Sequence, residues 1–338
     1  MQVKRRVIIM KKIINDPQKV VEEMLEGIQA ANPDVCYIEN MGVIARRTKT
    51  GRVGVVSGGG SGHEPMHAGY VGEGMLDAAV SGNVFASPDP ERILAGIKAA
   101  DSGKGVLLII TNYSGDCMNF SMAAELANME GISTASVIVR DDVSVKDSTT
   151  STGRRGIAGT ILVHKVAGAA AAAGHSLEEV RRLAQKAADN VRTMGMAMSS
   201  CTIPAIGRPG FELADDEVEL GMGIHGEPGV KRVKLMSAKE TARVLLSRIL
   251  NDLKETGSEF ALMVNGLGGT PLMELYILNR EAHIFLKSMG VKIHETFVGN
   301  YITSLEMAGC SLTLMRLDEE MKPLLEAPCD TMAWKRRA

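Results

Sequence analysis

The chain has 338 residues, which is enough for two domains or for one large α/β unit with a second lobe. Its 38 Lys and Arg residues nearly balance its 40 Asp and Glu residues, and the formal charge of -2 argues against nucleic acid as a direct partner. No run approaches the roughly 18 to 20 apolar residues of a membrane span. The five cysteines form no CxxC pair and follow no secretory segment, so we expect a reduced, cytoplasmic protein.

The amino-terminal segment contains two candidate starts. Residues 1–9 precede a second methionine, Met10, and we expect these nine residues to be a tag or a misassigned start. The apolar residues within 20–28 have helical spacing. Asp16 suits an N-cap and Pro17 suits a first helical position, so we predict that the first helix begins at Pro17.

The most informative stretch, residues 53–70, reads VGVVSGGGSGHEPMHAGY. Its β-branched run predicts a strand over 52–56, and the glycines of 57–62 predict a turn that ends at His63. Glycines allow backbone N–H groups to approach a ligand closely, and the histidine supplies a titratable group. Neither GxxxxGK[ST] nor GxGxxG is matched, so the pattern favours a small-molecule site without a nucleotide-phosphate signature. The alternative is a tight turn with a surface histidine.

Strands and helices alternate after this turn. The run GVLLII at 105–110 is typical of a parallel strand buried on both faces. The polar segment 141–155 is expected to form a loop over the site. The predicted elements of this half are strands 75–79, 105–110 and 133–139 and helices 87–100, 118–129, 156–173 and 177–198.

The composition turns to Pro and Gly at 201–209, which predicts a domain boundary there. We therefore predict one α/β domain over residues 10–200 and a second over residues 201–338. The alternation indicates the α/β class, with two lobes of mainly parallel or mixed sheets flanked by helices. The predicted elements of the second lobe are helices 238–254 and 272–288 and strands 260–264, 291–298 and 311–316.

Three further positions could carry chemistry. Asp116 follows a strand in NYSGDCMNF, where a carboxylate can act as a general base or cap the next helix. His225 lies among glycines in GMGIHGEPG, and a neutral imidazole there could add to a ketone as a hemiaminal or could simply be a turn histidine. The loop GLGGTP at 266–271 predicts an anion-binding helix start, with Thr270 before Pro271, or a turn needed for packing.

Other functional classes have less support. No HExxH or comparable pair occurs, so we expect no metal site. No GxSxG elbow marks Ser61 as a nucleophile. Four histidines in helical or strand-like segments are predicted to be satisfied structural residues: His164, His175, His283 and His294.

Three loops together are specific. GGGSGHEP at 58–65, NYSGDCMNF at 112–120 and GIHGEPG at 223–229 closely resemble the dihydroxyacetone-binding subunits of dihydroxyacetone kinases. The segments GNVFASP at 82–88 and NGLGGTP at 265–271 agree, so the resemblance covers nearly the whole chain. It implies a two-domain α/β homodimer that binds dihydroxyacetone or a similar short ketose.

The resemblance also implies roles for individual residues. The ketone would be held as a hemiaminal on His225, with His63 and Asp116 as the acid and base. Such a covalent test for a carbonyl rejects polyols such as glycerol. The implied substrate contacts are Gly60, Ser61, Gly62, His63, Thr111 and Asp116.

The phosphoryl donor would come from elsewhere. Family members that use ATP directly carry an additional nucleotide domain, which residues 1–338 do not contain. The resemblance therefore implies a phosphoenolpyruvate-dependent phosphotransferase in which this subunit binds no cofactor itself. ADP and Mg²⁺ are expected on a partner kinase subunit, which a phosphocarrier protein rephosphorylates.

One departure from the family pattern concerns the position before NYxGD. The family often has a lysine there, whereas this chain has Thr111, so a cationic contact is missing. The change could shift the substrate toward a four-carbon ketose such as erythrulose. It could also mark a ketose-sensing coactivator that controls a transcription regulator. Because His63, Asp116 and His225 are all retained, a working kinase subunit is favoured.

Overall fold

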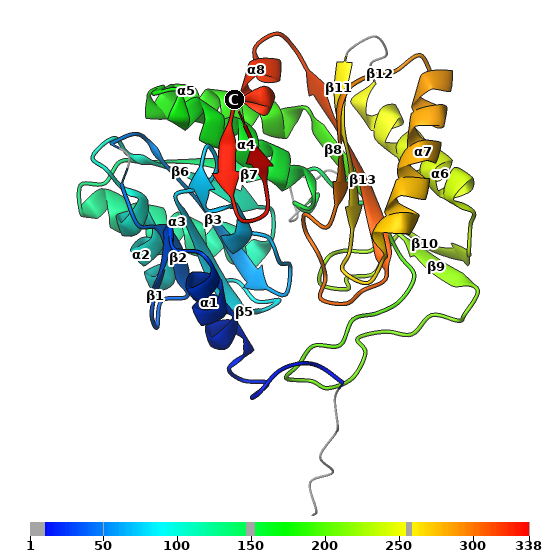
Figure 1. Cartoon of the computed structure of the whole chain (residues 1–338), viewed down its shortest axis with the longest axis horizontal. Helices are drawn as coiled ribbons and strands as arrows, with labels where there is room; N and C mark the ends of the chain where they lie inside the picture. The colour runs from blue at the N-terminus through cyan, green and yellow to red at the C-terminus, as the bar shows by residue number, and fades with distance from the viewer. Residues whose placement is uncertain (1–10, 50, 147–152, 255–258, 338) are drawn as a thin grey trace, which may run out of the picture.

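The structure, a computed structural model, describes residues 11–49, 51–146, 153–254 and 259–337. Two lobes lie side by side, each built on a six-stranded sheet within these described ranges (Figure 1). The blue and green lobe contains the N-terminal half of the chain, and the yellow and orange lobe contains most of the C-terminal half. The predicted α/β class with mixed sheets and flanking helices is confirmed.

The sheet of the first lobe has the strand order β1-β2-β5-β3-β6-β7. The strands β5, β3, β6 and β7 pair in parallel, whereas β1 and β2 add an antiparallel edge. Parallel pairing brings the carboxyl ends of β3 and β6 to the same edge of the sheet. The strands are β1 (Val35–Ile38), β2 (Val43–Arg46), β3 (Gly54–Ser61), β5 (Ala78–Val84), β6 (Val106–Thr111) and β7 (Thr134–Val139).

Helices cover both faces of this sheet, as its continuous apolar strands require. Along β6, Leu107 and Ile109 point into the core beside α4 and α5, while Leu108 and Ile110 pack with α2 and α3. The helices are α1 (Val20–Ala31), η1 (Ala68–Tyr70), α2 (Pro90–Ala100), α3 (Ser114–Met129), α4 (Gly159–Ala172) and α5 (Leu177–Asp189).

The sheet of the second lobe has the order β10-β9-β8-β13-β11-β12 and is antiparallel except for the pair β11 and β12. The helices α6 and α7 cover its outer face (Figure 1). The elements are β8 (Val191–Ala197), β9 (Glu217–Leu220), β10 (Lys231–Lys234), α6 (Ala238–Leu253), β11 (Glu259–Gly266), α7 (Leu272–Ser288), β12 (Lys292–Gly299) and β13 (Gly309–Leu317).

One hydrophobic core joins the two lobes. Side chains alternate along β11, so Leu262 and Val264 pack under α6 and α7 while Ala261 and Met263 face the first lobe. The alanine-rich helix α4 lies between the lobes and contacts strands of both sheets. After β13 the chain returns to the first lobe as α8 (Met321–Glu326), β14 (Cys329–Thr331) and β15 (Lys335–Arg336), and β14 pairs with β4 (Gly72–Glu73).

Several predicted elements are confirmed, and others are wrong. The helix predicted over 272–288 is α7, but the helix predicted over 177–198 ends at Asp189. Residues 191–197 form β8 instead, because they pair with β13 in the second sheet. Strand β8 lies within the first predicted range but belongs to the second sheet, and the elements after β13 return to the first lobe. The domain ranges 10–200 and 201–338 stay a prediction.

The predicted start of the first helix at Pro17 is wrong, whereas α7 begins at Leu272 as predicted. The first helix begins at Val20 because Asp16 accepts a hydrogen bond from the N–H of Gln18 and forms a turn ahead of it. Thr270 does not cap α7, because its hydroxyl exchanges hydrogen bonds with the backbone of Gly309 on β13. Asp16 and Thr270 thus each hydrogen-bond a backbone group outside the helix that follows them.

None of the helices in the described ranges is long and apolar enough to cross a membrane. The five cysteines are all free thiols.

Candidate active site

The glycine run belongs to strand β3, and its prediction as a turn is wrong. All eight residues of Gly54–Ser61 are buried in the strand. A Cβ on Gly58 would lie 2.4 Å from the carbonyl oxygen of Val80, and one on Gly60 would lie 2.6 Å from the backbone nitrogen of Ala86. These glycines therefore let β3 approach β5 and the turn after it. Positive φ is reached only at the strand exit, where Gly62 has φ 97°.

His63 follows this exit and is 1% exposed. Its Nδ1 lies 2.8 Å from the carbonyl oxygen of Thr303, in the second lobe. Because a carbonyl only accepts, Nδ1 carries the proton and Nε2 keeps a free lone pair. Nε2 is buried without a hydrogen-bond partner among the described residues. Burial, assisted by His225, lowers the pKa of His63 to about 3, so the ring is neutral at physiological pH.

His225 is held by a carboxylate two residues later in the chain. Its Nδ1 lies 2.8 Å from Oε1 of Glu227, and its backbone N–H donates to Oε2 at 2.9 Å. Although burial acts in the opposite direction, the contact with His225 lowers the pKa of Glu227 to about 2. The ionised carboxylate therefore accepts from Nδ1–H, which leaves the Nε2 lone pair of His225 available as a nucleophile.

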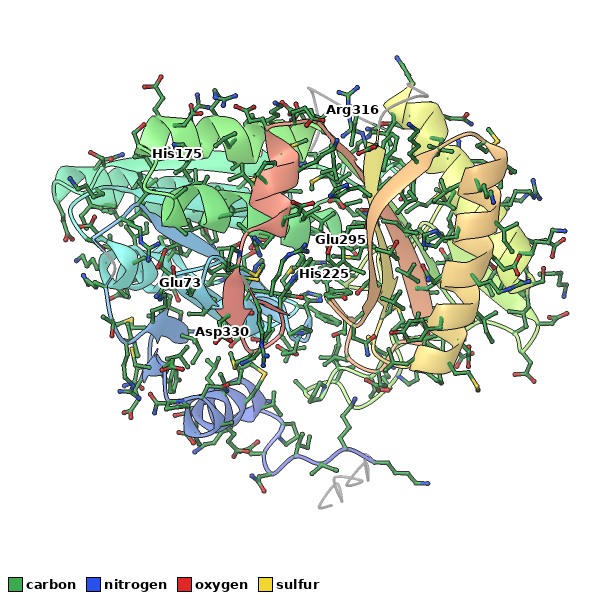
Figure 2. The ribbon with its side chains drawn as sticks, turned by 45° about the horizontal axis from the view of Figure 1, so that its top comes forward. Glu73, His175, His225, Glu295, Arg316 and Asp330 are labelled. Atoms are coloured by element: carbon green, nitrogen blue, oxygen red, sulfur yellow. The ribbon has the colours of Figure 1, made fainter. Side chains whose placement is uncertain are left out.

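The two histidines meet at the junction of the lobes. The ring centroids of His63 and His225 are 4.8 Å apart and nearly perpendicular. Figure 2 shows His225 in the middle of the molecule, between the two sheets. Phe85 stacks on His63 at 4.9 Å, and Tyr113 meets His225 edge-on at 4.7 Å. The predicted residues from positions 63 and 225 thus share one aromatic-lined site.

Asp116 lies in the first turn of α3 and is 4% exposed. It does not cap this helix, because its Oδ2 accepts the hydroxyl of Thr111 at 3.0 Å. Burial raises the pKa of Asp116, and hydrogen bonds from Ser87 and Thr111 oppose that rise. The Coulombic interaction with His225 also lowers this pKa. Thr111 therefore contacts the carboxylate directly, where a lysine would have placed a cation.

The other predicted substrate contacts have structural tasks of their own. Ser61 donates its hydroxyl to the carbonyl of Gly82 at 2.7 Å. The N–H of Gly62 is bound to Glu64 at 3.0 Å, and its carbonyl accepts from Leu305 at 2.8 Å. Contact between the substrate and Gly60, Ser61 or Gly62 stays a prediction.

The polar segment 141–155 reaches the His225 loop through Arg155. This guanidinium donates to Asp142 at 2.7 Å, to the hydroxyl of Ser144 at 2.9 Å and to the carbonyl of Gly221 at 2.7 Å. Although burial opposes its charge, Asp142 raises the pKa of Arg155. Residues 147–152 lie outside the described residues, so the position of segment 141–155 over the site stays a prediction.

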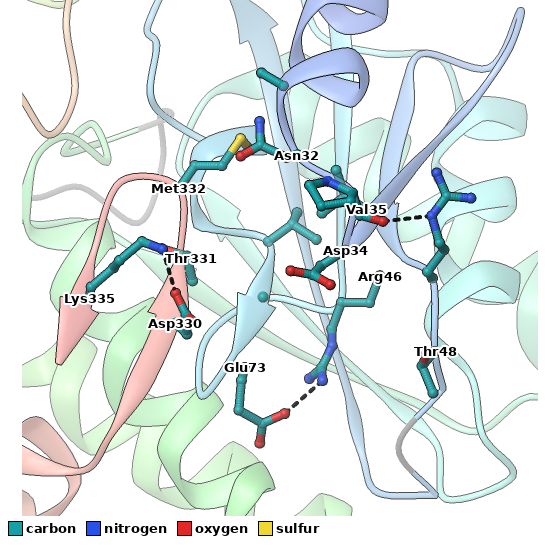
Figure 3. Close-up of a pocket in the computed structure, with 15 residues that line it drawn as sticks. Asn32, Asp34, Val35, Arg46, Thr48, Glu73, Asp330, Thr331, Met332 and Lys335 are labelled. Atoms are coloured by element: carbon teal, nitrogen blue, oxygen red, sulfur yellow. Dashed lines mark hydrogen bonds and ion pairs between the residues drawn. The ribbon is translucent and has the colours of Figure 1, made fainter. Parts of the chain in front are cut away.

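A separate groove of about 610 Å³ lies between α1, β2 and the C-terminal strands (Figure 3). Two ion pairs lie in its lining, since Arg46 contacts Glu73 at 2.6 Å and Lys335 contacts Asp330 at 2.8 Å. None of the predicted site residues lines it. In the described ranges, no group of three or more His, Cys, Asp or Glu side chains could hold a metal ion.

Sequence reasoning missed the residues that orient the histidines. Glu227 follows His225 by two positions in the GIHGEPG motif, and that spacing could have marked it as a partner of the ring. No local signal could have placed Thr303 against His63, because 240 positions separate the two residues. The prediction for His164 is wrong, since both of its ring nitrogens are buried without a partner in the described chain.

The fold and this geometry define a two-lobed α/β protein with a small-molecule site between its lobes. The family model of the Dak1 domain matches residues 26–333. The chain therefore belongs to the Dak1 domain family, as the three loops predicted.

Curated relatives match over nearly their full length. The chain is 55% identical to the PTS-dependent dihydroxyacetone kinase 1, dihydroxyacetone-binding subunit DhaK, of Listeria innocua, over 96% of this chain and 100% of the relative. It is 40% identical to the PEP-dependent dihydroxyacetone kinase, dihydroxyacetone-binding subunit DhaK, of Escherichia coli, over 96% of this chain and 99% of the relative.

Solved structures give the same fold. The dihydroxyacetone kinase operon co-activator Dha-DhaQ superposes with a TM-score of 0.89 at 38% identity, over 94% of this chain and 99% of that chain. The dihydroxyacetone kinase of C. freundii in complex with AMP-PNP and Mg²⁺ has a TM-score of 0.90 at 38% identity, over 97% of this chain and 61% of the longer one.

Proposed function

We propose that this chain is the dihydroxyacetone-binding subunit of a phosphotransferase-dependent dihydroxyacetone kinase. The observation that carries the proposal is the pairing of His225 and His63, whose rings lie 4.8 Å apart between the lobes. Both rings have their Nδ1 occupied by an acceptor, so each presents Nε2 as a lone pair. The names of curated relatives that match nearly end to end support the substrate and the reaction class.

The first chemical step is a covalent capture of the ketone. The Nε2 lone pair of His225 forms a bond to the carbonyl carbon, the C=O π-bond breaks, and the oxygen takes up a proton from water to become a hydroxyl. The ring then carries a positive charge, which the ionised Glu227 stabilises through Nδ1–H. A polyol has no carbonyl carbon to attack, so this step selects ketoses over glycerol.

Acid–base chemistry at the other end of the substrate follows from His63 and Asp116. The terminal hydroxyl must lose its proton as its oxygen attacks phosphorus. The neutral Nε2 of His63 and the buried carboxylate of Asp116 are both acceptors beside this site. A base is more effective when its pKa lies closer to neutral pH, and burial raises the pKa of Asp116 in that direction.

The phosphoryl donor belongs to a partner. We infer that ADP and Mg²⁺ are carried by a separate kinase subunit, which a phosphocarrier protein rephosphorylates, and that this chain binds no cofactor itself. The AMP-PNP and Mg²⁺ of the C. freundii complex occur in a longer chain, of which this one matches 61%. A homodimer in the cytoplasm completes the proposal, and sedimentation of the purified chain measures that assembly.

Intact mass measurement tests the covalent step. Mixing the purified chain with dihydroxyacetone should add the mass of one substrate molecule, and His225→Ala should abolish the adduct while His283→Ala retains it. Failure of the unsubstituted chain to form an adduct would contradict the hemiaminal. Addition of the nucleotide-carrying subunit and the phosphocarrier system should then yield phosphorylated ketose.

A ketose-sensing coactivator is the second candidate function. The similarity to the Dha-DhaQ co-activator favours it, together with Thr111 in place of the lysine frequent in the family. An adduct that forms without any phosphorylated product, in the presence of the complete donor system, would support the sensor. A kinase subunit that prefers a four-carbon ketose would instead phosphorylate erythrulose faster than dihydroxyacetone.

A further inference from the structure

The middle glycine of the run in β3 is not required by backbone packing. A Cβ on Gly58 or Gly60 would collide with backbone atoms, at 2.4 and 2.6 Å. A Cβ on Gly59 would instead meet only side chains, with His67 Nε2 at 3.4 Å and Asp116 Oδ2 at 3.7 Å as its nearest neighbours. Side chains alternate between the two faces of a sheet, so position 59 faces His67 and Asp116 while positions 58 and 60 face the opposite side. The missing side chain at position 59 therefore leaves space between a histidine and the Asp116 carboxylate.

His67 takes no part in the chemistry proposed above, yet it is 5% exposed and polar. Both of its ring nitrogens are buried without a hydrogen-bond partner in the described part of the chain. The ring of His164 lies 5.4 Å from it, and both nitrogens of His164 are likewise unpaired in the described ranges. Burial, with the nearby His164 and His63, lowers the pKa of His67 well below its usual value, so the ring is neutral.

Unpaired buried nitrogens of this kind indicate a small polar ligand. Leaving one such group unsatisfied costs about 1–3 kcal/mol, and ordered water is the usual partner of buried polar groups that lack one. Water can accept a hydrogen bond from a neutral imidazole N–H and donate one to a carboxylate. The space beside Gly59 has both kinds of neighbour.

We propose that a water molecule bound beside Gly59 bridges His67 Nε2 to Asp116 Oδ2, and that His67 is a positioning residue for this carboxylate. The inference rests on the proposed function, in which Asp116 accepts the substrate proton. A donated hydrogen bond stabilises the ionised carboxylate and holds Oδ2 toward the site, beside the hydroxyl of Thr111. His67 thus acts on the reaction through Asp116 without touching the substrate.

Other groups face His67 and Asp116 and affect their pKa values. His63, His164 and His225 are the titratable groups around them. Tyr70 packs against His164, and the hydroxyls of Ser87 and Thr111 bind Asp116. Substitutions at position 59 or 67 change none of these residues, so the variants test the bridge itself.

Gly59→Ala is the sharpest test, because it fills the space with one methyl group and leaves both bridged side chains intact. Without the water, Asp116 loses a donor to its ionised form, so its pKa rises and the acid limb of kcat moves to higher pH by on the order of one unit. His67→Leu should give the same shift, and His67→Gln, which keeps an amide donor, should give less. Gly195→Ala is the matched control, since its Cβ also has room, with nearest contacts of 3.5 to 3.7 Å.

Two results would overturn the inference. One is an acid limb of kcat that is unchanged in folded Gly59→Ala and in His67→Leu. If Gly59→Ala does not fold, identical pH profiles for His67→Leu and His67→Gln would overturn the inference instead. The other is a high-resolution crystal structure of the unsubstituted chain without a water between these atoms. Loss of the His225 adduct in the unsubstituted chain would instead contradict the proposed function, and the crystallographic test of the water would still stand.

Discussion

At the scale of single residues, the site depends on the groups that fix each imidazole. The histidines stand in recognisable motifs, so their importance could be predicted from the sequence. Their protonation could not, because it follows from Thr303 and Glu227, which act as acceptors at Nδ1. A motif identifies the histidine, whereas the hydrogen bond at one ring nitrogen decides whether the other nitrogen is a nucleophile or a hydrogen-bond donor.

Replacing Glu227 should therefore slow ketone capture. In Glu227→Gln the neutral amide no longer stabilises the positive ring that forms as the ketone adds. A hydrogen bond to a charged group contributes about 1.5–3 kcal/mol, so we expect adduct formation to slow by about 10- to 100-fold. Time-resolved intact mass measures this rate, and Glu240→Gln, an exposed carboxylate on α6, is the control. Equal rates for both variants would show that Glu227 has no such role.

Acid should destabilise the protein through its buried histidines. Burial lowers the pKa of His164 to about 3, so this ring stays neutral in the folded state while the unfolded chain protonates it below about 6.5. The stability it contributes is complete above pH 6.5 and is lost progressively as the pH falls toward 3. His164→Gln should therefore reduce the loss of unfolding free energy between pH 7 and pH 5 by about 2 kcal/mol.

Urea unfolding at the two pH values measures this difference, with the exposed His175→Gln as the control. The buried Asp141 changes the baseline in the opposite sense, because burial raises its pKa to about 6 and favours the protonated folded form in acid. Comparison of variants removes that shared contribution. An identical pH dependence in His164→Gln and the unsubstituted chain would contradict the prediction.

At the scale of elements, strand β3 shows what a local pattern can and cannot predict. The apolar start of the strand was predictable from its β-branched residues. Its continuation through Ser57–Ser61 was not, because glycines have low strand propensity and the pairing with β5 decides the outcome. The helix predicted over 177–198 failed in the same way, since tertiary pairing with β13 sets β8.

Alanine at Gly58 should destabilise strand β3. In Gly58→Ala the new Cβ lies 2.4 Å from the Val80 carbonyl, so β3 and β5 must separate. Overpacking of this kind costs about 1–3 kcal/mol, whereas Gly195→Ala, whose Cβ has nearest contacts of 3.5 to 3.7 Å, should be neutral or slightly stabilising. Denaturant unfolding of the two variants measures the difference. A stability of Gly58→Ala equal to that of Gly195→Ala would mean that β3 and β5 are not held at this spacing.

At the scale of the whole molecule, the site exists only because two lobes are held together. The alternation of strands and helices predicted the two lobes but not their contact. The backbone N–H of Leu305 donates to Gly62 at 2.8 Å, and the hydroxyl of Thr303 donates to Glu64 at 2.9 Å, which attaches the second lobe to the exit of β3. Arg155 makes the corresponding attachment at the His225 loop through Gly221.

Arg155→Lys tests this attachment without removing its charge. Lysine keeps the partner that the buried Asp142 requires, so the fold should survive. It cannot reproduce the planar fork that binds Asp142, Ser144 and Gly221 together, so the His225 loop should lose its fixed position. We expect adduct formation to slow by about tenfold, the equivalent of one hydrogen bond, with little change in unfolding. The exposed Arg140→Lys is the matched control. If the adduct forms as fast in Arg155→Lys as in Arg140→Lys, the catalytic histidine is positioned by the second lobe alone.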